Sequence, residues 1–163
     1  MATRQTTSVK RDEFALFVDM LRFASLISRP MRDGVADPAG FSSNELRILM
    51  ALSGEKEAAG HDLAELMGMH AMNVSRALAS LCRMGLIEAV KSSSNLRRKP
   101  YRLSARGKRA HRALKSNIAQ ISRYIFGPLT DREFATLERL LAKMDRRVLT
   151  WQPDDRRPHV PRA

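Results

Sequence analysis

The sequence predicts a mainly helical protein with one small β-hairpin. Apolar residues recur at helical spacing in several segments that are bounded by glycine, proline or capping residues. Two short runs with strand composition, residues 86–90 and 100–104, are separated by nine mostly polar residues that suit a long hairpin loop. At 163 residues the chain can bury a core, as one domain or as two small lobes.

The N-terminal part predicts two helices. Residues 12–28 are apolar over much of a helical circumference, so this helix needs packing partners on more than one side. The segment 29–40, which contains Pro30, Gly34, Pro38 and Gly40, is expected to end it. Ser42 and Glu45 have the spacing of a capping box, which predicts a short helix that ends near Gly54.

Two further helices follow a connector at residues 55–60. They cover about 61–68 and 70–85, with Gly68 at the turn between them and Gly85 at the end of the second. On the second helix an apolar face is expected to pack against the first, through Val74, Leu78 and Leu81 on one side and Leu63 and Leu66 on the other.

The C-terminal part predicts two long helices. Ser104 is placed to cap a helix over residues 105–126, and Thr130 and Glu133 form a second capping box before the last helix. Both helices carry heptad-like apolar seams: Leu114, Ile118, Ile121 and Ile125, then Phe134, Leu137, Leu141, Met144 and Val148. Ordinary core packing would explain them, but their length favours a dimer interface.

Positive charge is concentrated in one segment. Residues 91–115 hold ten of the 29 Lys/Arg and no Asp or Glu, in a chain whose formal net charge is +12. Such a localised excess is typical of a surface for nucleic acid or for an anionic membrane.

The order of these elements favours DNA. Helix, short helix, glycine turn, helix, strand, basic loop and strand is the order of a winged helix-turn-helix, with residues 70–85 as the recognition helix. Its outward face is polar, as major-groove readout requires. Arg76 suits guanine, Asn73 suits adenine, and Met72 could contact a thymine methyl. Ser75 and Ser80 are small enough to let the helix approach the bases closely.

The sequence resembles the MarR family of bacterial transcription regulators over roughly residues 12–148. "DLAELMGMHAMNVSRALASLCRMGLIE" is similar to that family's helix-turn-helix and first wing strand. Asn95-Leu96-Arg97 precedes "LSARG" at the interval of the family's wing motif, with Asn95 where the family commonly has Asp. Residues 41–52 and "GPLTDREFATLERLLAKM" resemble its second and closing helices.

The resemblance implies a homodimer that binds double-stranded DNA at a pseudo-palindromic operator and represses transcription. In the wing, Arg97 is expected to enter the minor groove, and Arg98 and Lys99 to hold phosphates, with Asn95 beside them. A helix N-terminus at Ser42, Ser43 and Asn44 could also bind phosphate.

The resemblance also implies an organisation and an effector. A discontinuous dimerisation lobe (12–30 and 105–148) would carry a DNA-binding lobe (42–104), with flexible tails at 1–11 and 152–163. A small aromatic or phenolic ligand is expected between the lobes, near Met20, Arg22 and Arg47, and would release the DNA.

Other classes of function find little support in the sequence. We expect no catalytic residues, metal or cofactor, because the four histidines are scattered and no phosphate loop or nucleophile motif is present. A cytoplasmic protein without a membrane partner is expected. The alternatives are a winged-helix DNA-binding protein without a ligand switch, a redox-responsive regulator that uses Cys82, and a basic adaptor at protein or membrane surfaces. The adaptor is disfavoured because the charge lies on a hairpin and not opposite an apolar helix face.

Overall fold

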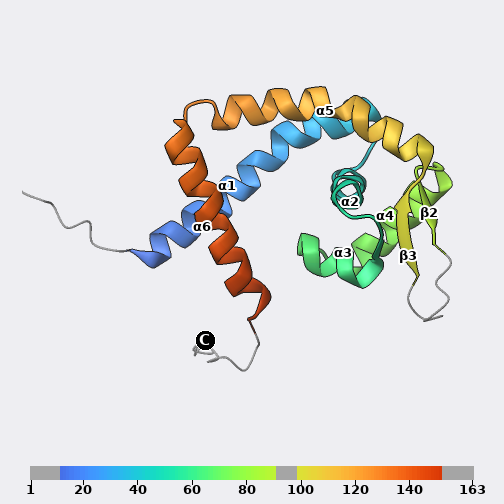
Figure 1. Cartoon of the computed structure of the whole chain (residues 1–163), viewed down its shortest axis with the longest axis horizontal. Helices are drawn as coiled ribbons and strands as arrows, with labels where there is room; N and C mark the ends of the chain where they lie inside the picture. The colour runs from blue at the N-terminus through green and yellow to red at the C-terminus, as the bar shows by residue number, and fades with distance from the viewer. Residues whose placement is uncertain (1–11, 91–98, 152–163) are drawn as a thin grey trace, which may run out of the picture. The chain divides into compact units, whose positions relative to one another are not determined.

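The computed structural model describes residues 12–90 and 99–151 (Figure 1). The chain divides into two compact units, residues 1–121 and 122–163. The described residues form helices and one small antiparallel sheet, which confirms the predicted fold class. None of the described helices is long and apolar enough to cross a membrane.

Helix α1 (Glu13–Met31) begins at Asp12, whose carboxylate accepts the Ala15 N–H at 2.9 Å. The helix ends at Met31, within the predicted breaking segment 29–40, and Pro30 lies inside its last turn. Proline lacks an N–H but does not prevent one further residue from keeping helical geometry there. The chain then continues through a π-helical turn, η1 (Arg32–Ala36), and a 3-10 turn, η2 (Asp37–Ala39).

Helix α2 (Ser43–Gly54) has the predicted capping box. The Ser42 hydroxyl accepts the Glu45 N–H at 3.2 Å, and the Glu45 carboxylate accepts the Ser42 N–H at 2.7 Å. Four apolar side chains of α2 lie in the core: Leu46, Ile48, Leu49 and Leu52. Because α2 contacts α3, α4 and β3, it is the central helix of the first unit.

Helices α3 (Gly60–Met67) and α4 (Ala71–Arg83) form the helix-turn-helix. Gly68 adopts φ 56° and ends α3, a left-handed conformation that glycine adopts without strain. The predicted contact through Leu66 is wrong, since this side chain is 53% exposed. The inner side of α3 is instead occupied by Leu63 and by Met67 one turn later, both of which pack into the core.

Three strands form a sheet in the order β1-β3-β2. The predicted hairpin strands are β2 (Ile87–Ala89) and β3 (Pro100–Leu103), paired with Glu88 opposite Arg102. The third strand, β1 (Ala58–Ala59), lies in the segment predicted to be a connector. Two alanines carry no strand signal of their own, so only their pairing with β3 makes them a strand.

Helix α5 (Ala105–Phe126) begins at a tight junction with the hairpin. The Ser104 hydroxyl donates to the Gly85 carbonyl at 2.7 Å and accepts the Gly107 N–H at 3.0 Å. A Cβ on Gly107 would lie 1.9 Å from the Leu86 carbonyl oxygen. Only glycine therefore fits where α5 crosses the end of the wing.

The two predicted seams have different environments. On α5, Leu114 is buried, and Ile118 and Ile121 pack against the core of the first unit. On α6 (Asp131–Leu149), which begins at the predicted Thr130 capping box, the seam includes Phe134 at 46% and Val148 at 71% exposure. The α5 seam is thus largely core, whereas the α6 seam remains available to a partner.

Candidate DNA-binding surface

Helix α4 is strongly two-sided. Its inner side is fixed in the core by four buried side chains: Val74, Ala77, Leu78 and Leu81. This anchorage sets the rotation of the helix and turns Met72, Ser75 and Arg76 to the surface, with Met72 64% exposed. The face that these three residues share is the one predicted to meet DNA.

Two other predicted readout residues are less exposed. Asn73 is half-buried near the start of α4. Ser80 is also half-buried, and its hydroxyl donates to the Glu45 carboxylate of α2. The structure therefore places Ser80 against its own protein, apart from the exposed group.

Glu45 links the DNA-facing helix to the helix behind it. Burial alone would raise the pKa of this carboxyl. Hydrogen bonds from Ser80 and Ser42, together with the charge of Arg83, outweigh burial and hold the pKa below its ordinary value. An ionised Glu45 thus accepts hydrogen bonds from both sides and ties α4 to the N-terminus of α2.

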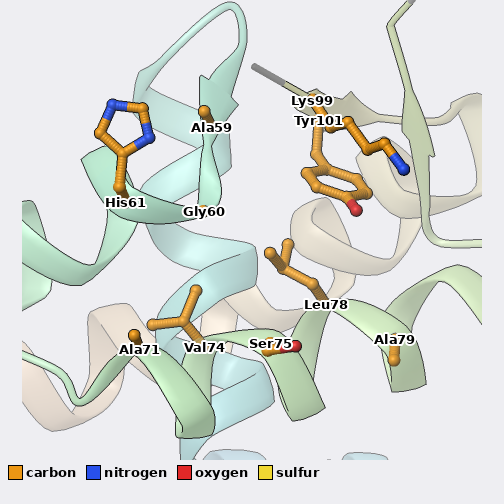
Figure 2. Close-up of a pocket in the computed structure, with 10 residues that line it drawn as sticks. All are labelled: Ala59, Gly60, His61, Ala71, Val74, Ser75, Leu78, Ala79, Lys99 and Tyr101. Atoms are coloured by element: carbon orange, nitrogen blue, oxygen red, sulfur yellow. The ribbon is translucent and has the colours of Figure 1, made fainter. Parts of the chain in front are cut away.

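An open groove of about 410 Å³ lies between α4, the start of α3 and strand β3 (Figure 2). It brings together two predicted site residues from different elements, Ser75 of α4 and Lys99 at the base of the wing. Its walls also contain His61 and Tyr101, which the sequence analysis did not single out. Tyr101 lies on β3, within the predicted strand 100–104, but nothing in the sequence places His61 beside the same groove.

The structure describes only the base of the wing, where strands β2 and β3 pair. Asn95, Arg97 and Arg98 lie outside the described residues, so their predicted roles stay predictions. Lys99 is exposed immediately before β3. The Val90 N–H donates to the Pro100 carbonyl at 2.8 Å and continues the pairing of the two wing strands toward the loop.

The predicted phosphate site at the N-terminus of α2 is partly used by the fold. The Ser42 hydroxyl is occupied by the capping box. Ser43 is exposed and Asn44 is half-buried. Of the three predicted residues, Ser43 is therefore the one that is exposed and is not used by the helix cap.

The three predicted ligand residues are not brought together. Arg47 lines a hollow of about 210 Å³ between α1, α2 and α3, and its guanidinium donates to the Met67 carbonyl. The other lining residues are mostly apolar: Ile27, Ser28, Met31, Arg32, Ser43, Leu46, Met50 and Met67. Met20 and Arg22 do not border this hollow, and Arg22 pairs instead with Asp19 at 2.9 Å.

Cys82, the residue that a redox-responsive regulator would use, is exposed on α4. Partial burial of the sulfur still raises the pKa of the Cys82 thiol. A raised pKa lowers the thiolate fraction near neutral pH and so reduces reactivity toward oxidants. Within residues 12–90 and 99–151, no group of three or more His, Cys, Asp or Glu could hold a metal ion.

Comparison with known proteins agrees with the resemblance to the MarR family. Residues 39–98 match the sequence model of the MarR family, a segment that includes α2, β1, α3, α4 and β2. No relative among curated protein sequences matches the chain.

Solved MarR structures share the fold over most of the chain. A MarR transcriptional regulator from Methanosarcina mazei Go1 is 17% identical with a TM-score of 0.73, covering 85% of this chain and 92% of that one. BpsR from Bordetella bronchiseptica, whose DNA binding is regulated by 6-hydroxynicotinic acid, is 17% identical with a TM-score of 0.69 (80% and 98% covered). The C80S mutant of E. coli MarR, solved with operator DNA, is 19% identical with a TM-score of 0.64 (82% and 99% covered). The chain therefore has the fold of MarR transcription regulators.

Proposed function

We propose that this chain is a homodimeric transcription regulator that represses by binding a pseudo-palindromic operator through α4 and the wing. The observation that carries the proposal is the fixed rotation of α4. Its apolar side is locked in the core, so Met72, Ser75 and Arg76 are presented together on the outer side. A narrow, polar and basic outward face is what an α-helix needs to read base edges in the major groove.

The groove beside α4 supports a continuous contact surface. Lys99 stands across it from Ser75, at the base of the predicted minor-groove wing (Figure 2). Operator phosphates that pass between the recognition helix and the wing would meet this lysine. The DNA-bound E. coli MarR structure gives the same fold a DNA partner, which is consistent with this assignment.

A homodimer is supported by apolar surface that the single chain leaves uncovered. Helix α1 has no buried residue, and Phe14, Phe17 and Leu21 on it are each more than half exposed. The α6 seam is likewise exposed, as at Val148. Soluble monomers rarely expose contiguous apolar patches of this kind, so both helices are assigned to a dimerisation lobe.

The mostly apolar hollow at Arg47 supports an effector with an aromatic or phenolic body and an anionic group. Met31, Leu46 and Met50 would cover the ring, and Arg47 would pair with the anion. BpsR, which shares the fold, responds to such a compound, 6-hydroxynicotinic acid. A ligand that prefers one dimer geometry would release DNA by favouring recognition helices that no longer match the half-sites.

Replacing Arg76 tests the DNA-binding role. DNA that the wild-type protein selects from a randomised pool is titrated by gel shift at fixed salt. Arg76→Ala should lose about 1–3 kcal/mol of binding free energy, because a well-placed arginine contact to guanine is removed. The matched control is Arg109→Ala, which removes the same charge from an exposed position on α5. Equal losses in both variants would mean that α4 makes no specific contact.

A thermal-shift series tests the ligand switch against a regulator without one. Aromatic carboxylates should raise the melting temperature in proportion to the logarithm of their concentration, by an amount equivalent to about 2.7 kcal/mol at a ligand concentration of 100 Kd. Acetate at the same concentration is the control. Arg47→Lys keeps the charge but loses the two-pronged guanidinium, so its ligand-induced shift should be smaller. If no aromatic carboxylate raises the melting temperature of the wild-type protein, a DNA-binding protein without a ligand switch is favoured.

A further inference from the structure

A second hollow in the first unit has a chemistry different from both sites above. It measures about 500 Å³ and lies between the C-terminal end of α2, strand β3 and the first turns of α5. Its lining is mostly charged or polar: Leu52, Ser53, Glu55, Lys56, Arg102, Leu103, Lys108, His111, Arg112 and Lys115. An aromatic effector would find little apolar surface here.

Positive side chains reach this hollow from three separate elements. On α5, Lys108, Arg112 and Lys115 lie at helical spacings of four and three residues, so they share one face with His111. Lys56 adds a charge from the segment after α2, and Arg102 adds one from β3. Among the lining residues Glu55 is the single carboxylate, so the folded chain holds five cations around one small space.

His111 lines the same hollow as these five cations. Burial, and then the charge of Lys115, lower the pKa of its imidazole below the ordinary value. Because burial and the charge of Lys115 both disfavour a proton on His111, further positive charge is disfavoured at this place. A bound anion would reverse that balance.

The hollow is separate from the DNA-binding groove, since no residue lines both: Tyr101 lines the groove, whereas Arg102 and Leu103 line the hollow. Arg102 is held by its cross-strand partner Glu88, which accepts from the Arg102 Nε at 2.8 Å and offsets part of its charge. DNA lying along α4 and the groove would therefore not fill this hollow.

We propose that this hollow binds a small anion that contains at least two phosphate groups. Ammonium and guanidinium groups both donate charge-assisted hydrogen bonds to phosphate oxygens. Groups on three elements can surround one such ligand, which relieves the repulsion among them. The site is independent of operator reading and of the aromatic-ligand hollow.

The test uses the full chain without DNA, titrated with inorganic pyrophosphate by calorimetry at constant ionic strength balanced with sodium chloride. Inorganic phosphate, run in parallel, separates a site for a single phosphate from one that needs two. Pyrophosphate should bind saturably with one site per chain. In proton NMR the pKa of His111, assigned by its loss in His111→Gln, should rise on binding because the anion favours the imidazolium.

Two double variants with the same net charge distinguish a specific pyrophosphate site from non-specific electrostatic attraction. Lys108→Gln/Lys115→Gln removes two lining cations and should weaken pyrophosphate binding by about tenfold or more. Arg106→Gln/Arg109→Gln removes two exposed charges of α5 that do not line the hollow, and should change binding by less than about twofold.

Three results would overturn the proposal: no saturable binding by the wild-type protein, equal weakening in both double variants, or an unchanged His111 pKa. If the Lys108/Lys115 variant loses affinity for DNA while the wild-type protein does not bind pyrophosphate, the hollow contacts the DNA backbone and the assignment to a small anion is wrong. Because the pyrophosphate titration contains no DNA, its outcome does not depend on the proposed regulator function.

Discussion

At the scale of single residues, the Glu45 carboxylate connects the DNA-facing helix to the core. It completes the capping box of α2 and accepts the Ser80 hydroxyl of α4. The sequence predicted the first role, because a capping box is a local pattern. It did not predict the second, because Ser80 and Glu45 are 35 positions apart and only the packing of α4 on α2 joins them.

Replacing Glu45 by Gln should make this link measurable through pH. The pKa of Glu45 is lowered in the folded protein, so its charge stabilises the fold above the unfolded pKa of about 4.3 and loses this effect as the pH falls through the folded value. At pH 7 Glu45→Gln should reduce the free energy of unfolding by about 0.5–1.5 kcal/mol. The difference between the two proteins should shrink toward pH 3.

Urea titrations at several pH values provide the measurement, with Glu65→Gln as the control, since Glu65 is exposed on α3. A Glu45→Gln deficit that is the same at pH 3 and pH 7 would show that the carboxylate charge does not contribute.

At the scale of secondary-structure elements, the junction between the wing and α5 depends on backbone proximity. Ser104 joins the end of β3 to the Gly85 turn, and Gly107 lets α5 approach the Leu86 carbonyl. This junction explains why "LSARG" stands where it does: the serine caps the helix, and the glycine leaves space for the strand.

Gly107→Ala should destabilise the protein, since its Cβ would meet a backbone oxygen at 1.9 Å and the strand or helix must move. The overpacking should cost about 1–3 kcal/mol, more than alanine gains in helix propensity. Gly60→Ala is the matched control, because its Cβ would meet Leu78 Cδ1 at an ordinary 3.5 Å. Thermal or urea unfolding measures both; a Gly107→Ala protein as stable as the wild type would contradict the close approach.

The elements themselves were predictable where their signals are local. Capping residues set the starts of α2 and α6, and apolar periodicity gave the buried side of α4. Signals that depend on distant partners were missed: β1 exists only through its pairing with β3, and Leu66 turns outward because Met67 takes the inner position. For the same reason, the grouping of Lys56, Arg102 and Lys115 around one hollow could not be predicted from their spacing.

At the scale of the whole molecule, the proposed function rests on the fixed rotation of α4 and on two helices that leave apolar surface uncovered. Helix α1 exposes Phe14 and Phe17, and α6 exposes most of its predicted seam. If these faces form a dimer, two copies of α4 are related by a two-fold axis. The DNA must then carry the same symmetry, with half-sites about 34–36 Å apart or a multiple of that spacing.

Hydroxyl-radical footprinting of the wild-type protein on DNA flanking its own gene tests this claim most directly. The account predicts two protected half-sites related by a dyad, with centres about 10–10.5 base pairs, or a multiple of this, apart. A single protected patch without two-fold symmetry, or no protection at concentrations that bind selected DNA, would contradict it.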